Sequence, residues 1–296
     1  MFKGLCAFPL TPMDESGTDD RAYLQLITRL VSANVDSICV LGSTGNYAYL
    51  PREERARLIR LATEVTGSVP VMTSIGALRT RDVLYAAEDA QNAGAKALLL
   101  APVSYQKLTD EEVFSLYQTV AQSVSVPLCV YENPGTTHFN FSDELLIRLA
   151  QLPATGSIKL SGGYPDKESY LKRIRKLRAA LPERVSLGIS GDAFAAPAIN
   201  AGCDTWFSVT GGLFPQAAMN ITHKALNGMS DEGASYSLAL EPLWDLFRQY
   251  GSLRVMAAAA ATLGLAAETC LPLPLTMPDG EARNKIRQVL HRLKLV

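Results

Sequence analysis

The sequence contains little of what metal sites and disulfide frameworks require. Its 296 residues include only three histidines and five cysteines. None of the cysteines forms a Cys-X-X-Cys pair or shows the spacing of zinc ligands, and most lie in apolar segments, where buried free thiols are common. The sequence therefore predicts neither a zinc centre nor a disulfide scaffold, and free thiols fit a reducing cytoplasm.

Long apolar runs and an excess of either charge are also missing. The chain has 28 lysines and arginines against 29 aspartates and glutamates, so it offers no electrostatic basis for binding nucleic acid or an anionic membrane. No apolar run approaches the roughly 18 residues needed to cross a bilayer. Pro9 interrupts the apolar segment after Lys3, which is too short for a signal peptide. We expect a cytoplasmic protein that binds neither nucleic acid nor membrane.

Short apolar segments alternate with amphipathic ones along most of the chain. The apolar segments are mainly aliphatic or β-branched and precede turn-forming residues, a pattern typical of buried parallel strands. Eight such units predict an α/β fold, a (β/α)8 TIM barrel. A doubly wound open sheet is the alternative, but Thr11-Pro12-Met13 stands where such sheets usually carry a phosphate-binding GxGxxG turn. The predicted strands are Gly4–Leu10, Ser37–Leu41, Val69–Thr73, Ala97–Ala101, Pro127–Tyr131, Gly156–Lys159, Val185–Ser190 and Thr205–Val209.

Helices are predicted between these strands and throughout the C-terminal part. After about Pro215 the strand pattern stops, and only helical patterns follow. We expect residues 1–214 to form the catalytic barrel and residues 215–296 to form a helical region that packs on it or supplies a subunit interface. The predicted helices are Asp19–Ala33, Pro51–Val65, Arg81–Ala93, Asp110–Ser123, Ser142–Leu152, Asp166–Leu181, Ala193–Ala201, Gln216–Asn227, Asp231–Tyr250, Leu253–Leu263 and Gly280–Leu293.

Lys159 ends the sixth predicted strand and is the only charged residue between Gln151 and Asp166. In a (β/α)8 barrel the chemistry lies at the C-terminal ends of the strands, whereas Lys3 and Lys96 precede theirs. Desolvating an ammonium is costly, and the neutral amine has a lone pair that can attack a carbonyl. We interpret Lys159 as an amine that forms a Schiff base with a 2-oxo acid. The alternative is a lysine whose ammonium reaches water at the strand end.

Polar turns follow other predicted strands. The second strand leads into Gly42–Gly45, where backbone N–H groups and hydroxyls can surround an anion, and a carboxylate suits this turn better than a triphosphate. A tight turn with capping hydroxyls is the alternative reading. Tyr131 ends the fifth strand, where a phenol either shuttles protons for imine chemistry or packs on the barrel rim. Gly191 and Asp192 follow the seventh strand and supply a small polar wall.

The ordered set of motifs GSTGN, YENPG, IKLSGG, SGD and SVTGG resembles the dihydrodipicolinate synthase/N-acetylneuraminate lyase family of class I aldolases. The resemblance covers nearly the whole chain, including the helical tail. It implies that Lys159 is the Schiff-base lysine and that Tyr131 relays protons. It also implies that Ser43 and Thr44 hold the pyruvate carboxylate and complete the relay. Members of this family are typically homotetramers, often dimers of dimers, and use no metal or organic cofactor.

Several positions depart from the family pattern. Thr136 stands where synthases carry an arginine for the carboxylate of the aldehyde substrate, and a neutral threonine cannot make that bidentate contact. We therefore do not expect lysine-pathway synthase activity. Asn46 replaces a glutamate, and His138 replaces a glycine. Ser104 occupies the position of a second relay tyrosine, so either the adjacent Tyr105 takes its place or the relay is altered.

We predict a Schiff-base lyase or aldolase that forms or cleaves a C–C bond next to pyruvate or another 2-oxo acid, with a hydroxylated or small neutral aldehyde as the partner. One alternative is a dehydratase or hydratase of a 2-oxo-deoxy sugar acid that uses the same imine. Others are a metal-dependent aldolase, whose ligands the scattered histidines do not supply, and a non-catalytic 2-oxo-acid sensor. The predicted catalytic residues are Lys159, Tyr131 and Ser43. The predicted substrate-binding residues are Thr44, Gly42, Gly45, Thr136, His138, Ser104, Tyr105, Gly191, Asp192 and Phe207.

Overall fold

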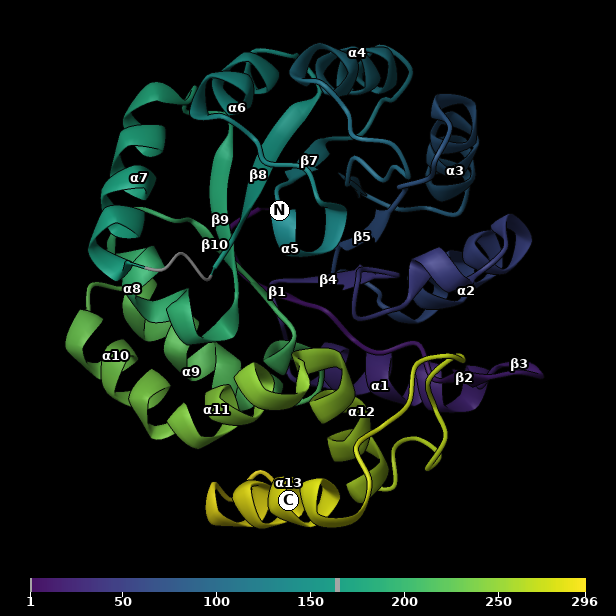
Figure 1. Ribbon diagram of the computed structural model, residues 1–296, viewed down its shortest axis with the longest axis vertical. Coiled ribbons are helices and arrows are strands. Elements are labelled where there is room, and N and C mark those ends of the chain that lie inside the picture. Colours follow the sequence, from purple (N-terminus) through teal and green to yellow (C-terminus); the bar gives the residue numbers. More distant parts are fainter. Residues whose placement is uncertain (1, 163–165) are drawn as a thin grey trace.

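Eight parallel strands close into a barrel that is surrounded by helices (Figure 1). The computed structural model describes residues 2–162 and 166–296, so Gly163, the last residue of the IKLSGG motif, lies outside the described residues. The predicted (β/α)8 barrel is confirmed, and the open sheet is excluded because β1 pairs with both β10 and β4. The barrel strands are β1 (Gly4–Ala7), β4 (Ser37–Val40), β5 (Val71–Ser74), β6 (Ala97–Leu100), β7 (Leu128–Tyr131), β8 (Thr155–Ser161), β9 (Ser186–Ser190) and β10 (Thr205–Ser208).

Nearly all residues of the barrel strands are buried, which explains their aliphatic composition. Alternate side chains enter the barrel, where Cys6, Cys39 and Cys129 pack with Met72 and Leu99. The intervening side chains pack beneath the surrounding helices. Burial raises the pKa of the Cys6 and Cys129 thiols to about 12, so both stay protonated at neutral pH and serve as packing groups.

The helices around the barrel begin at residues that satisfy their free N–H groups. Asp19 accepts a hydrogen bond from the Ala22 N–H at the start of α1, and Thr109 forms a capping box with Glu112 at the start of α4. A two-stranded hairpin of β2 (Met13–Asp14) and β3 (Gly17–Thr18) was not predicted. The helices are α1 (Asp20–Ser32), α2 (Arg52–Val65), α3 (Thr80–Asn92), α4 (Asp110–Ala121), α5 (Pro134–Thr137), α6 (Asp143–Ala150), α7 (Lys167–Ala180) and α8 (Ala195–Asn200).

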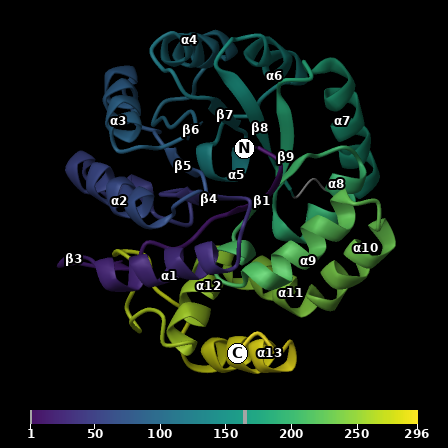
Figure 2. The same ribbon diagram turned by 180° about the vertical axis from the view of Figure 1, so that it is seen from behind.

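The C-terminal part is helical, as predicted, and lies beside α1 on one side of the barrel (Figures 1 and 2). The single predicted helix Asp231–Tyr250 is wrong, because the structure has two helices there that meet at Leu240. Pro242 has no N–H to donate and therefore lies in the first turn of a new helix rather than inside a long one. These helices are α9 (Pro215–Leu226), α10 (Ser230–Ala239), α11 (Glu241–Tyr250), α12 (Ser252–Thr262) and α13 (Gly280–Arg292). Within the described residues, none of the helices is long and apolar enough to span a bilayer.

Candidate active site

Lys159 lies in β8 with its side chain buried inside the C-terminal end of the barrel. Its residue exposure is 2 %, so the amine does not extend into bulk water. The Nζ atom lies 4.0 Å from the ring centroid of Phe8, 4.0 Å from that of Tyr131 and 5.7 Å from that of Phe207. Among the residues that the structure describes, no carboxylate forms an ion pair with this amine. In its neutral form, an amine held in this position has a lone pair that can attack a carbonyl.

Tyr131 faces Lys159 across two adjacent strands. The two residues are register partners in the β7–β8 pair, so their side chains leave neighbouring strands at the same level. The Tyr131 hydroxyl accepts a hydrogen bond of 2.8 Å from the amide of Asn133, which lies directly before α5. Because Asn133 donates to this oxygen, the phenol proton is directed elsewhere and can pass to a group at Lys159.

The turn Gly42–Gly45 approaches the same end of the barrel through Phe8. A Cβ atom at Gly42 would lie 2.5 Å from the Phe8 ring, and one at Gly45 would lie 2.8 Å from the backbone of Leu41. Both positions therefore require glycine. Since the Phe8 ring contacts both Gly42 and the Lys159 amine, the turn lies close to the candidate site. Thr44 is buried and Ser43 is half-buried in this turn.

Asp192 lies in a hydrogen-bonded network below the surface. Its Oδ1 accepts from the Trp206 indole N–H at 3.0 Å, and its Oδ2 accepts from the N–H and the hydroxyl of Thr210 at 2.7 and 2.5 Å. Burial raises the pKa of this carboxyl, while these hydrogen bonds act in the opposite direction. Both carboxylate oxygens are thus occupied by protein donors that fix the end of β10. Gly191 precedes it with φ of 101° and touches Gly162.

Four further predicted substrate-binding residues lie in the segments that follow β6 and β7. Thr136 and His138 are both exposed on and after α5, and His138 has a left-handed φ of 57°. The Ser104 hydroxyl donates to the Gln106 carbonyl at 2.5 Å. Tyr105 is 92 % exposed, whereas Lys159 is buried. The structure therefore brings together Lys159, Tyr131, Phe207 and the Gly42–Gly45 turn, but it does not bring Tyr105 to them.

Sequence reasoning missed a buried charge cluster behind this site. Glu132 is 1 % exposed, and its Oε2 accepts from the N–H and the hydroxyl of Ser161 at 2.8 and 3.1 Å. Its Oε1 lies 3.2 Å from Arg173 of α7, whose Nε contacts Asp143 at 2.7 Å. The Tyr170 hydroxyl donates to the Ser161 carbonyl at 2.8 Å. The cluster fixes β8 two residues beyond Lys159, and a lone glutamate inside an otherwise uncharged strand end was its only sequence signal.

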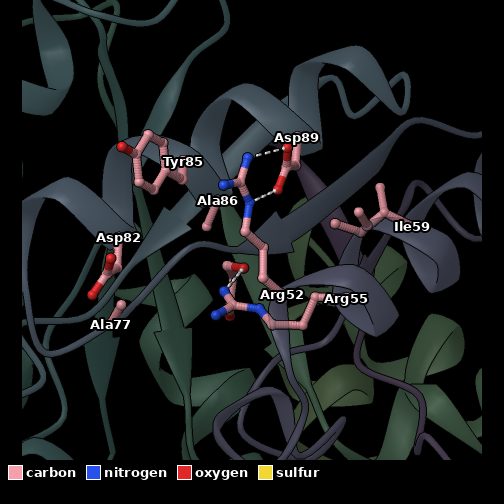
Figure 3. A pocket seen from close by; sticks show the side chains of 10 residues that line it. Arg52, Arg55, Ile59, Ala77, Asp82, Tyr85, Ala86 and Asp89 are labelled. Atoms are coloured by element: carbon pink, nitrogen blue, oxygen red, sulfur yellow. Dashed lines mark hydrogen bonds and ion pairs between the residues drawn. The ribbon is translucent and has the colours of Figure 1, made fainter.

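A separate cavity of about 220 Å³ lies between α2 and α3 (Figure 3). Arg52 makes two hydrogen bonds to Asp89, and Arg55 donates to the carbonyl oxygens of Ser74 and Gly76 at 2.9 and 3.3 Å. Arg52 therefore binds a carboxylate on α3, and Arg55 binds carbonyl oxygens at and just after the end of β5. No grouping of three or more histidine, cysteine, aspartate or glutamate side chains suited to a metal ion occurs in residues 2–162 and 166–296.

Comparison with known proteins gives one consistent result. The model of the dihydrodipicolinate synthetase family matches residues 1–293. A 4-hydroxy-tetrahydrodipicolinate synthase of Methylococcus capsulatus is 30 % identical over 99 % of both chains. A crystal structure of dihydrodipicolinate synthase from Agrobacterium tumefaciens is 44 % identical, with a TM-score of 0.94 over 99 % of this chain and 98 % of that one. The enzyme of Acinetobacter baumannii, solved with pyruvate, is 25 % identical with a TM-score of 0.93 over the full length of both chains.

Proposed function

Because the chain belongs to the dihydrodipicolinate synthetase family, whose members are class I Schiff-base lyases acting on pyruvate, we propose that Lys159 is its imine-forming residue. The observation that carries this assignment is the placement of its amine. Lys159 lies at the C-terminal end of a barrel strand, almost fully buried, 4.0 Å from the ring of its register partner Tyr131. A buried amine beside a phenol supplies both a nucleophile and a proton carrier.

The proposed reaction uses groups that lie around this amine. Lys159 attacks the carbonyl carbon of pyruvate, and the resulting carbinolamine loses water to give a protonated imine. Loss of a methyl proton then gives an enamine, whose carbon adds to an aldehyde; cleavage is the reverse of this addition. Tyr131 carries protons to and from the departing and arriving oxygens. The N–H groups and hydroxyls of the turn at Ser43 and Thr44 hold the pyruvate carboxylate.

In our proposal, Thr136 gives this chain a different second substrate from that of the synthases, which carry an arginine at this position. The neutral, exposed side chain of Thr136 offers no charge-assisted contact to a substrate carboxylate. We further propose that the enzyme is a cytoplasmic homotetramer without metal or organic cofactor, with the chemistry in residues 1–214 and the helices of residues 215–296 packed on the barrel. Family membership supports these assignments.

Trapping of the imine tests the proposal. The protein is incubated with pyruvate and borohydride, and its intact mass and peptide map are measured. We expect one reduced pyruvyl group per chain, located on Lys159. Lys96, which is exposed at the opposite end of the barrel strands, serves as an internal control for non-specific reductive alkylation. Absence of an adduct, or an adduct distributed over exposed lysines, would refute the assignment.

Tyr131→Phe is expected to slow formation of the imine, because it removes the hydroxyl that carries protons to and from the departing oxygen while the Lys159 amine remains. The variant retains the ring that contacts the amine and loses only the hydroxyl. General acid–base groups contribute roughly 10²–10⁴-fold, and we expect about a hundredfold loss. The readout is exchange of the pyruvate methyl protons in D₂O, followed by NMR, because it requires no second substrate. An unchanged exchange rate would exclude Tyr131 from the relay.

A further inference from the structure

A second cavity lies over the ends of β8, β9 and β10, beneath α11 and α12. Its volume is about 490 Å³. The barrel side includes Gly162, Phe194 and Val209, and the helical side includes Trp244, Phe247 and Arg248. Gly162 and Gly191 touch each other at its base, where a Cβ atom on Gly162 would lie 2.7 Å from the Ser190 carbonyl oxygen. Gly162 and Gly191 thus allow the ends of β8 and β9 to approach each other, and larger side chains line the cavity above them.

This cavity lies next to the candidate active site. Gly162 follows Lys159 by three residues and comes directly after β8, and Val209 follows Phe207 by two residues and comes directly after β10. The Phe207 ring lies 5.7 Å from the Lys159 Nζ atom. A molecule that binds in the cavity is therefore at the catalytic face of the barrel, beside the ends of β8, which carries Lys159, and of β10, which carries Phe207.

The walls of the cavity are mainly aromatic. The Phe194 ring meets Tyr170 edge to face, with a centroid separation of 6.0 Å. The Trp244 and Phe247 rings are 5.6 Å apart, and Trp244 donates its indole N–H to the Ser237 carbonyl at 2.9 Å. Because these rings are held by neighbouring groups, they form a preformed apolar surface.

The cavity offers no unpaired positive charge to a ligand. Arg248 is the only cation among its described lining residues, and it pairs with Glu241 and with Asp245, the latter at 2.5 Å. One guanidinium and two carboxylates leave this cluster with a formal charge of −1. Asp192, the other charged lining residue, has its carboxylate oxygens occupied by Trp206 and Thr210. A carboxylate entering the cavity would approach a cation that already has two carboxylate partners, in a cluster of net negative charge.

We propose that the second substrate is an uncharged aldehyde whose aromatic or other apolar group occupies this cavity. The inference rests on the proposed function, because it requires an enamine at Lys159. The enamine carbon bonds to the aldehyde carbon, the aldehyde oxygen takes a proton and becomes a hydroxyl, and water then hydrolyses the imine to release a 4-hydroxy-2-oxo acid. The apolar group replaces water on the faces of Phe194 and Phe247, which favours binding.

Condensation rates with three aldehydes, measured one at a time, test this substrate class. With pyruvate in excess, condensation is measured with benzaldehyde, glyceraldehyde and succinic semialdehyde. We expect kcat/KM for benzaldehyde to exceed the other two at least tenfold. Phe247→Ala should lower the benzaldehyde value about tenfold, whereas Leu238→Ala, a truncation of a 70 % exposed side chain on α10, should leave it unchanged. A preference for glyceraldehyde or succinic semialdehyde would overturn the inference.

A second variant tests the charge argument directly. The double substitution Glu241→Gln and Asp245→Asn removes both partners of Arg248 at exposed positions. It should raise kcat/KM for succinic semialdehyde about tenfold and leave benzaldehyde within twofold; no gain would contradict the role of the cluster. Trapping with pyruvate and borohydride tests the proposed function separately from the inference about the second substrate. An adduct on Lys159 with the wrong aldehyde preference refutes only this inference, whereas no adduct refutes the proposed function and this inference with it.

Discussion

Lys159→Met is expected to give a protein that is more stable than the wild type and almost inactive. The lysine is buried among three aromatic rings, and among the described residues it has no acidic partner. Burying such a polar group costs about 1–3 kcal/mol, part of which contact with the rings offsets. Methionine has a similar length and makes favourable sulfur–aromatic contacts. We expect a gain of about 1–2 kcal/mol in the free energy of unfolding.

The activity of the same variant should fall by roughly 10⁴–10⁶, as it does when a nucleophile is removed from an enzyme. The two measurements are thermal unfolding and deuterium exchange into pyruvate. A gain of 1 kcal/mol corresponds to about 2–4 °C in Tm. Lys96→Met, at an exposed position before β6, is the control and should change neither quantity appreciably. Exchange above a hundredth of the wild-type rate would show that Lys159 is not the imine-forming residue.

The fold could be predicted from the sequence because parallel barrel strands are buried on both faces. This produces continuous aliphatic segments such as Ser37–Val40 and Ala97–Leu100, which stand out from the amphipathic helices around them. The strand bounds in the structure differ from the predicted ones by a few residues at most. The break at Leu240 was missed although Pro242 signalled it, because the helical pattern of apolar residues continues on both sides.

The candidate site was predictable only in part. Lys159 and Tyr131 stand at strand ends, and barrel topology alone places such residues at one face. Loop residues are different, since the exposed position of Tyr105 depends on the path of its loop rather than on its distance from a strand. The contact between Glu132 and Arg173 joins residues 41 positions apart, and nothing local indicates it. Side chains alternate along a strand, so Glu132 and Tyr131 point to opposite faces, but this alternation does not show what Glu132 meets there.

Glu132→Ala is expected to destabilise the protein by about 3–5 kcal/mol, the range for removing one partner of a buried ion pair. The Arg173 side chain is only 14 % exposed, so it would lose a partner in a poorly solvated place. Asp143 retains its contact with Arg173 and limits the loss. The N–H and hydroxyl of Ser161 would also lose their shared acceptor, and each unsatisfied buried donor is costly. Chemical denaturation of the wild type and the variant measures the difference.

Glu132→Gln is the matched control, because it keeps an acceptor for Ser161 and removes only the charge. We expect it to lose about 1–2 kcal/mol, the net value of a charge-assisted hydrogen bond. If the cluster positions Lys159 through Ser161, the folded Glu132→Ala variant should exchange the pyruvate methyl protons more slowly than the wild type. Glu132→Gln should largely retain the wild-type rate. If both variants lose the same fraction of the pyruvate exchange rate, the effect comes from the negative charge of Glu132 and not from the acceptor for Ser161. Full exchange in both would mean that Glu132 stabilises the barrel without positioning the amine, since Ser161 would then tolerate the loss of its acceptor without moving β8.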